Sequence, residues 1–116
     1  MTGNVVVLVT CANAAEAAHI ARALVEARLA ACVNVLQAPV RSTYRWKGNV
    51  EEAAEHLLII KTSRRRLDAL EREVKRLHSY EVPEVIALPI AAGSPAYLRW
   101  LADCLRPEPR RKRSKK

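Results

Sequence analysis

The segment LHSYEVPEVIALPI, residues 77–90, places side chains that bind metals or protons between a helix-patterned and a strand-patterned segment. His78 supplies an imidazole, and Glu81 and Glu84 supply carboxylates on either side of Pro83. Imidazole and carboxylate together suit a borderline cation such as Cu²⁺ or Zn²⁺. The alternative is structural: His78 favours the negative end of a helix, and Glu84 pairs with a cation. The residues alone leave both interpretations open.

Two protein ligands are too few for tight binding, so a third ligand must come from Cys32, water or a neighbouring chain. Cys32 begins a strand-like segment, where a small buried core residue is the competing explanation. We therefore predict a metal site of His78, Glu84 and Cys32 that binds Cu²⁺ or another divalent cation weakly. No organic cofactor is predicted.

Two further cysteines complete the inventory of thiols. Cys11 precedes a helix N-terminus, which favours a thiolate, so we predict it to be the more reactive thiol; Cys104 is interpreted as packing. Three cysteines without C-x-x-C spacing indicate neither a disulfide framework nor a zinc knuckle, and favour a reducing cytoplasm. The chain has no G-x-S-x-G motif, no cysteine and histidine at a recognised spacing, and no phosphate-binding glycine loop, so we do not predict an enzyme.

Length and charge divide the chain into one domain and a tail. With 116 residues, half of them hydrophobic, the chain can build one core, which we assign to residues 1–106. Six of its 20 Lys and Arg residues lie in RRKRSKK at 110–116, which leaves 14 against 12 Asp and Glu elsewhere. Residues 107–116 are therefore predicted to be a disordered basic tail that binds nucleic acid weakly at most. No apolar run approaches the roughly 20 residues of a membrane span.

Hydrophobic periodicity predicts alternating strands and helices. Strands are expected at 4–11, at 31–46 with an interruption at Pro39, at 50–62 after a turn at 47–49, and at 84–90; helices are expected at 13–28 with Asn13 as cap and Glu16 three residues on, at 64–77 with Ser63 as cap, and at 94–106 with Ser94 as cap. This order is the ferredoxin-like β-α-β-β-α-β motif, an α+β fold, with a C-terminal helix.

The apolar patterns also predict an oligomer. Residues 4–11 and 57–60 are continuously apolar, as in strands buried on both faces, whereas two helices cover only one face of the sheet. The long hairpin of the second and third strands must project beyond its own core, because a strand of a dozen residues reaches about 40 Å. Self-association would bury the free face of the sheet.

The chain resembles the CutA divalent-cation tolerance family. The segments VTCANAAEA, ARALVEARLAACVNV, STYRWKGNVEE, LLIIKT, LHSYEVPEVIALPI and YLRWL carry the resemblance, in order, from about residue 5 to 105. It implies a ferredoxin-like homotrimer related in architecture to the PII proteins. It also implies a role in tolerance of copper and other divalent cations, and animal relatives are linked to membrane anchoring of acetylcholinesterase.

The same resemblance implies site residues and departures from them. Tyr44, Trp46 and Lys61 would line an inter-subunit cleft with the loop of His78, Tyr80 and Glu84, although the aromatic residues would equally seal a trimer interface. By its own position, a lysine that ends the buried strand LLIIK indicates either a partner carboxylate, Glu84, or a bound anion. The copper ligands of some bacterial members correspond to Val9, Leu77 and His78, of which only His78 is a ligand type. Ser79 replaces a usual proline, which predicts a less rigid junction. The alternative function is a PII-like regulatory trimer that binds a small anionic metabolite or a partner protein.

Overall fold

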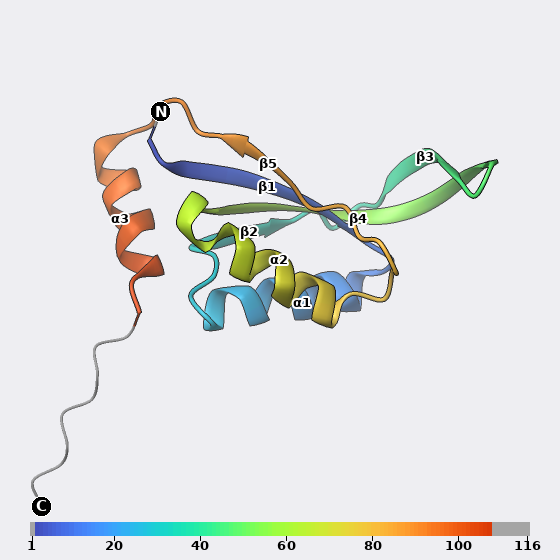
Figure 1. The fold of residues 1–116 in the computed structure, drawn as a ribbon, viewed down its shortest axis with the longest axis horizontal. Coiled ribbons are helices and arrows are strands. Elements are labelled where there is room, and N and C mark those ends of the chain that lie inside the picture. The colour runs from blue at the N-terminus through green and yellow to red at the C-terminus, as the bar shows by residue number, and fades with distance from the viewer. Residues whose placement is uncertain (1, 108–116) are drawn as a thin grey trace, which may run out of the picture.

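The computed structural model describes residues 2–107, which form five strands and three helices (Figure 1). The elements are β1 (Asn4–Cys11), α1 (Ala14–Glu26), β2 (Cys32–Val35), β3 (Val40–Trp46), β4 (Asn49–Ser63), the 3₁₀ turn η1 (Arg64–Arg66), α2 (Leu67–Leu77), β5 (Ile86–Pro89) and α3 (Pro95–Leu105). None of the helices in this part of the chain is long and apolar enough to cross a membrane. The predicted basic tail falls outside the described residues from position 108 onward.

The strands form an antiparallel sheet in the order β2-β4-β1-β5. β1 and β4 are central, as the ferredoxin-like motif requires, and Val7 is paired with Ile60 between them. Helices α1 and α2 lie side by side against one face of this sheet, and α3 stands at the end near the N-terminus (Figure 1). The predicted α+β fold class is therefore confirmed.

The core lies between the sheet and the two helices. Alternate side chains of β1 and β4 are buried against α1 and α2, and the cluster includes Val5, Val7, Val9, Leu58, Ile60, Ile20, Leu24, Leu70 and Val74. Burying each such side chain contributes about 1.5–3 kcal/mol. The intervening residues, among them Leu8 and Ile59, are only half-buried, so a single chain does not bury both faces of these strands as their composition predicts.

The interruption that Pro39 predicts within 31–46 is observed. Residues 36–39 separate β2 from β3, and Pro39 has no N–H to donate to a ladder. β4, with 15 residues, pairs with both pieces. The β3–β4 ribbon extends well beyond the helices, and the described chain is about 60 Å long (Figure 1). The projecting hairpin is thus observed.

Local capping explains two of the helix starts. Asn13 Oδ1 accepts the N–H of Glu16 at 2.8 Å, and Ser94 Oγ accepts the N–H of Tyr97 at 3.3 Å with Pro95 at the first helical position. Ser63 does not cap α2 as predicted, because η1 intervenes and its side chain makes no capping bond. α2 therefore begins at Leu67.

The hairpin tip yields a testable prediction. Lys47 and Gly48 both have positive φ, 51° and 85°, as in the two-residue type I′ turn that matches strand twist. We expect Gly48→Ala to cost roughly 1 kcal/mol, because an L side chain is strained in this conformation. A projecting two-stranded ribbon is marginally stable by itself, so the loss should appear as faster amide hydrogen exchange in 42–52 and not as a lower melting temperature.

Lys47→Asn is the matched control, because asparagine tolerates positive φ better than lysine does. This variant should keep or slow the exchange of the hairpin amides. Equal exchange in the wild type and in Gly48→Ala would contradict the assignment of the turn.

Candidate functional site

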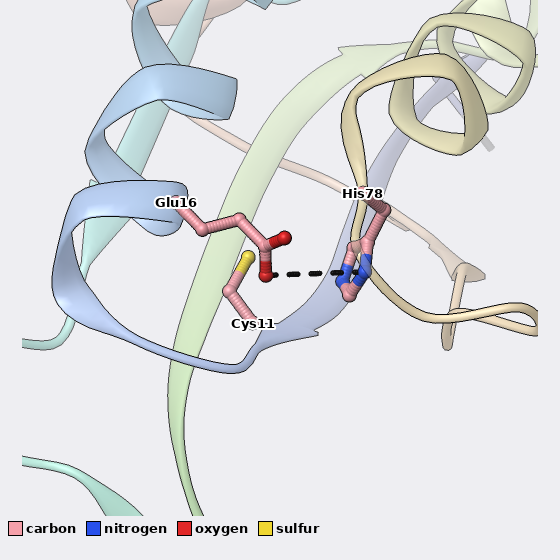
Figure 2. Close-up of side chains that lie close together, drawn as sticks. All are labelled: Cys11, Glu16 and His78. Carbon is pink, nitrogen blue, oxygen red and sulfur yellow. Dashed lines mark ion pairs between the residues drawn. The ribbon is translucent and has the colours of Figure 1, made fainter.

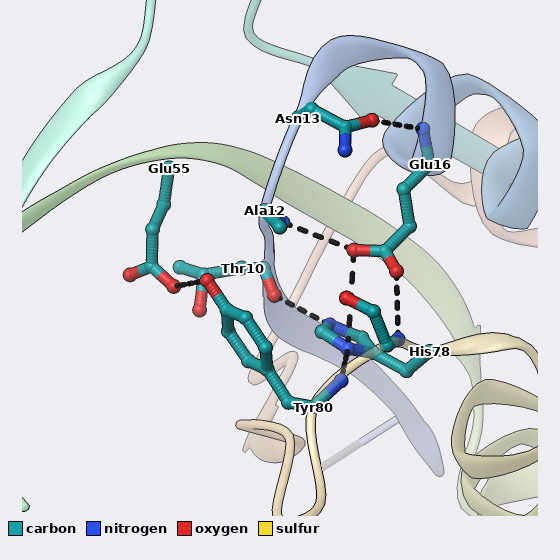
Figure 3. Close-up of polar contacts among 8 residues, drawn as sticks. Thr10, Ala12, Asn13, Glu16, Glu55, His78 and Tyr80 are labelled. Carbon is teal, nitrogen blue, oxygen red and sulfur yellow. Dashed lines mark hydrogen bonds and ion pairs between the residues drawn. The ribbon is translucent and has the colours of Figure 1, made fainter.

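His78 lies at the end of α2, where it ties a loop to the sheet. Its N–H donates to Val74 O at 2.9 Å, and its backbone is extended, which ends the helix. The buried ring makes two hydrogen bonds: Nε2 donates to Thr10 O at 2.7 Å, and Nδ1 accepts the N–H of Tyr80 at 3.0 Å (Figure 3). Both ring nitrogens are therefore engaged by backbone groups.

Glu16 completes this junction from the first turn of α1. Its Oε1 accepts the N–H of Ala12 at 3.0 Å, and its Oε2 accepts the N–H of Ser79 at 2.7 Å (Figure 3). Burial opposes ionisation of this carboxyl, but the hydrogen bonds from Ala12 and Ser79 outweigh it and hold its pKa below the usual value. A proline at position 79 would have no N–H for Glu16, so the predicted loss of rigidity at Ser79 is compensated by this hydrogen bond.

Cys11, Glu16 and His78 form a compact group of possible metal ligands. One donor atom from each lies within 4.8 Å of the others, and Glu16 Oε1 is 3.9 Å from His78 Nδ1 (Figure 2). Thiolate, carboxylate and imidazole are a donor set that zinc or copper accepts. However, the imidazole and carboxylate atoms are already hydrogen-bonded to backbone N–H and C=O groups. A cation would have to displace those bonds, so the group fits a structural junction better than a metal centre.

The prediction of Cys11 as a reactive thiol is wrong. Cys11 is fully buried, and burial, followed by the carboxylates of Glu16 and Glu55, raises the pKa of the thiol to about 12. Because the thiolate is the reactive form, such a thiol is inert at neutral pH. The nearby helix N-terminus does not compensate for the lost hydration and the two negative charges.

A pocket of about 600 Å³ opens beside this junction, between the hairpin and the loop at 80–84. Its lining residues come from β1, β3, β4 and the loop: Thr10, Ser42, Thr43, Tyr44, Trp46, Glu55, Tyr80, Glu81, Val82 and Glu84. Four of the predicted cleft residues, Tyr44, Trp46, Tyr80 and Glu84, are thus brought together. His78 does not line the pocket, but its ring fixes the loop at 80–84 by accepting the N–H of Tyr80.

Tyr80, Glu55 and Glu84 of this pocket interact through a hydrogen bond and through charge. The Tyr80 hydroxyl donates to Glu55 Oε2 at 2.7 Å (Figure 3), and burial together with this bond raises the pKa of Tyr80. Burial, and then the charge of Glu55, also raises the pKa of Glu84. The pocket is therefore a region of negative potential.

The structure does not bring Lys61 or Cys32 to this pocket within one chain. The two residues are paired between β2 and β4, and Lys61 Nζ donates to Asn34 Oδ1, not to Glu84. Lys61 follows Glu55 by six residues on the same strand, which is roughly 20 Å. The predicted pair of Lys61 and Glu84 is therefore absent from the single chain.

Sequence reasoning did not identify Glu16 and Glu55 as site residues. Glu16 was explained by its capping position, although its side chain reaches Ala12 instead of the cap residue and extends to Ser79. Glu55 precedes the apolar run LLII, and a lone carboxylate at the start of a buried strand is a signal that could have identified it.

Comparisons with known proteins identify the family to which the chain is similar. The sequence matches the family model of the CutA1 divalent ion tolerance protein over residues 5–104. A protein CutA homolog from Xenopus laevis is 53% identical over 95 residues, 82% of this chain and 62% of that protein. The divalent-cation tolerance protein CutA of Thermus thermophilus is 50% identical over 98 residues, 84% of this chain and 94% of that protein.

Solved structures agree with the fold. The Thermus thermophilus Cut A1 structure has a TM-score of 0.82 at 50% identity and covers 84% of this chain and 94% of its own. The periplasmic divalent cation tolerance protein CutA from Archaeoglobus fulgidus has a TM-score of 0.85 at 35% identity and covers 89% and 99%. The chain spans 62% and 52% of the lengths of the Xenopus laevis and Mus musculus relatives.

The junction of Glu16 predicts a pH-dependent contribution to stability. We expect Glu16→Gln to lower the free energy of unfolding by about 1–3 kcal/mol at pH 7, because an amide replaces a charged acceptor of two backbone N–H groups. The folded pKa of Glu16 lies below its ordinary value of 4.5. The contribution is therefore complete above that value and is lost as the pH falls through the folded pKa.

Urea unfolding of the wild type and the variant at pH 7 and pH 3 measures this difference. Glu26→Gln, an exposed change in the same helix, is the control and should cost less than about 1 kcal/mol. A deficit in Glu16→Gln that is as large at pH 3 as at pH 7 would show that the charge is not its source.

Proposed function

We propose that this chain, which belongs to the CutA1 divalent ion tolerance family, contributes to tolerance by binding divalent cations weakly at clefts shared within a homotrimer. The observation that carries the proposal is the charge of the pocket. It is lined by Glu55, Glu81 and Glu84, and none of its lining residues is basic. Carboxylate oxygens are ligands for many divalent cations, and the pocket opens them to solvent.

Glu84 and Glu55 are the proposed principal ligands. The pKa of Glu84 is raised by burial and by Glu55, and a bound cation would relieve both effects. His78 stays a proposed ligand only for a cation, such as Cu²⁺, that displaces the Tyr80 N–H from Nδ1. Cys32 joins them only if it comes from another chain, since its own chain keeps it on β2.

The trimer is proposed from the face of the sheet opposite α1 and α2. Ile86 and Leu88 of β5 are paired with Leu8 and Val6, and each is 50% exposed. Paired residues share a face, so these side chains form one apolar surface with the half-buried residues of β1 and β4. Cys32 and Lys61 lie on the same face by register, where a second copy would meet them.

The cytoplasm stays the predicted location, and no catalytic activity is proposed. Among the relatives, a rice protein is named chloroplastic and the Archaeoglobus fulgidus protein is named periplasmic. The alternative PII-like function, with an anionic metabolite, is less favoured by this pocket, because three carboxylates repel an anion.

The trimer has a direct test. We expect sedimentation equilibrium to give three times the chain mass of 13.0 kDa. Leu88→Lys should shift the protein towards the monomer, because association would bury an unpaired charge on the free face. Val25→Lys, at an exposed position of α1, is the matched control and should leave the mass unchanged. A wild type that sediments as a single chain would contradict the proposal.

Metal binding is tested by titration calorimetry with Zn²⁺ and Cu²⁺. Glu84→Gln should weaken binding about tenfold or more, because a charged ligand is lost. Because the pKa of Glu84 is raised, protons should compete with the metal from a higher pH than they would at an ordinary glutamate. Glu71→Gln, on the outer face of α2, is the control.

Identical isotherms for the wild type and Glu84→Gln would remove Glu84 from the site. The electron paramagnetic resonance spectrum of bound Cu²⁺ separates the two ligand sets. Nitrogen hyperfine structure that disappears in His78→Gln would assign the imidazole, and oxygen-only coordination would assign the carboxylates.

A further inference from the structure

The pocket has an aromatic wall that a metal ion does not require. Tyr44 and Trp46 alternate along β3, so their rings lie on one side of the strand, and they remain 42% and 40% exposed. Tyr80 adds a third ring from the loop. Lys47 Nζ lies 5.6 Å from the centroid of Trp46, so an ammonium group already rests on one of these rings. Aromatic faces attract such cations through their quadrupole.

A carboxylate lines the same pocket as these rings. Glu55 is only 6% exposed, and its Oε2 accepts the Tyr80 hydroxyl. Its Oε1 has no hydrogen-bond partner among residues 2–107, yet no fully buried side-chain oxygen there lacks one, so Oε1 must remain accessible. Glu55 is also one of the residues that line the pocket. Figure 3 shows Oε1 on the side of the carboxylate away from Tyr80.

The volume also exceeds what a metal ion needs. A water molecule takes about 30 Å³, so a fully hydrated divalent ion fills roughly a third of the 600 Å³. Pockets of roughly 300–1,000 Å³ ordinarily hold organic ligands. The occupant should therefore combine positive charge with apolar surface.

We propose that this pocket binds an organic alkylammonium ion. The ammonium group is held between Glu55 and Glu84, and the carbon chain lies along Tyr44 and Trp46. This ligand class goes beyond the proposed binding of metal ions, because it uses the same carboxylates, Glu55 and Glu84, together with the aromatic wall that a metal ion does not require.

The test is calorimetric titration of the full chain with 1,5-diaminopentane in the presence of EDTA, so that no metal ion takes part. 1,5-Pentanediol has the same chain without charge and should bind at least about tenfold more weakly, which corresponds to one charged hydrogen bond. Absence of saturable binding of the diamine at millimolar concentrations, or equal binding of the diol, would overturn the proposal.

Variants separate the aromatic wall from the carboxylates. Tyr44→Leu should weaken diamine binding roughly two- to fivefold through the lost cation–π contact, and Glu84→Gln about tenfold. Tyr97→Leu, at an equally exposed tyrosine of α3, should change nothing. Zn²⁺ binding should be unchanged in Tyr44→Leu, so failure of this proposal and failure of metal binding are distinguishable.

A lysine of another copy is the competing occupant. If the diamine binds to Lys61→Met but not to the wild type, the pocket is filled by the chain itself and the proposal is wrong. Equal binding to both proteins supports an organic ligand from solution.

Discussion

The buried ring of His78 connects the core to the site. One ring nitrogen donates to Thr10 O at the end of β1, and the other accepts the N–H of Tyr80, so a single side chain fixes the loop against the sheet. The position of Tyr80 then places its hydroxyl on Glu55, which belongs to β4. Glu16 supports the same turn through Ser79. The pocket keeps its shape because this hydrogen-bonded chain runs from the core outward, with every buried side-chain nitrogen and oxygen in the described residues hydrogen-bonded.

The resemblance to the family implied a copper site from which this chain departs. The positions corresponding to two of those ligands are Val9, which is fully buried in the core, and Leu77, which packs against it. The remaining histidine holds the loop. The carboxylates of Glu55, Glu81 and Glu84 instead line the neighbouring pocket.

The sequence predicted those features that depend on periodicity and local capping. The strand order, the central positions of β1 and β4, and the caps at Asn13 and Ser94 follow from spacing along the chain. Contacts between distant positions could not be read in this way. The bond from Tyr80 to Glu55 joins residues 25 positions apart, and Glu16 and Ser79 are 63 apart. The role of His78 was ambiguous because its partners are backbone groups, which no side-chain pattern encodes.

The hairpin supplies one wall of the pocket. The loop at 80–84, which His78 fixes to the core, supplies the other. Among the described strands β3 is hydrogen-bonded only to β4, and its rings remain exposed, so they contribute little to the stability of the domain. The ribbon from 40 to 54 can thus be exchanged as a graft, which would replace one wall of the pocket while the scaffold beneath it is retained.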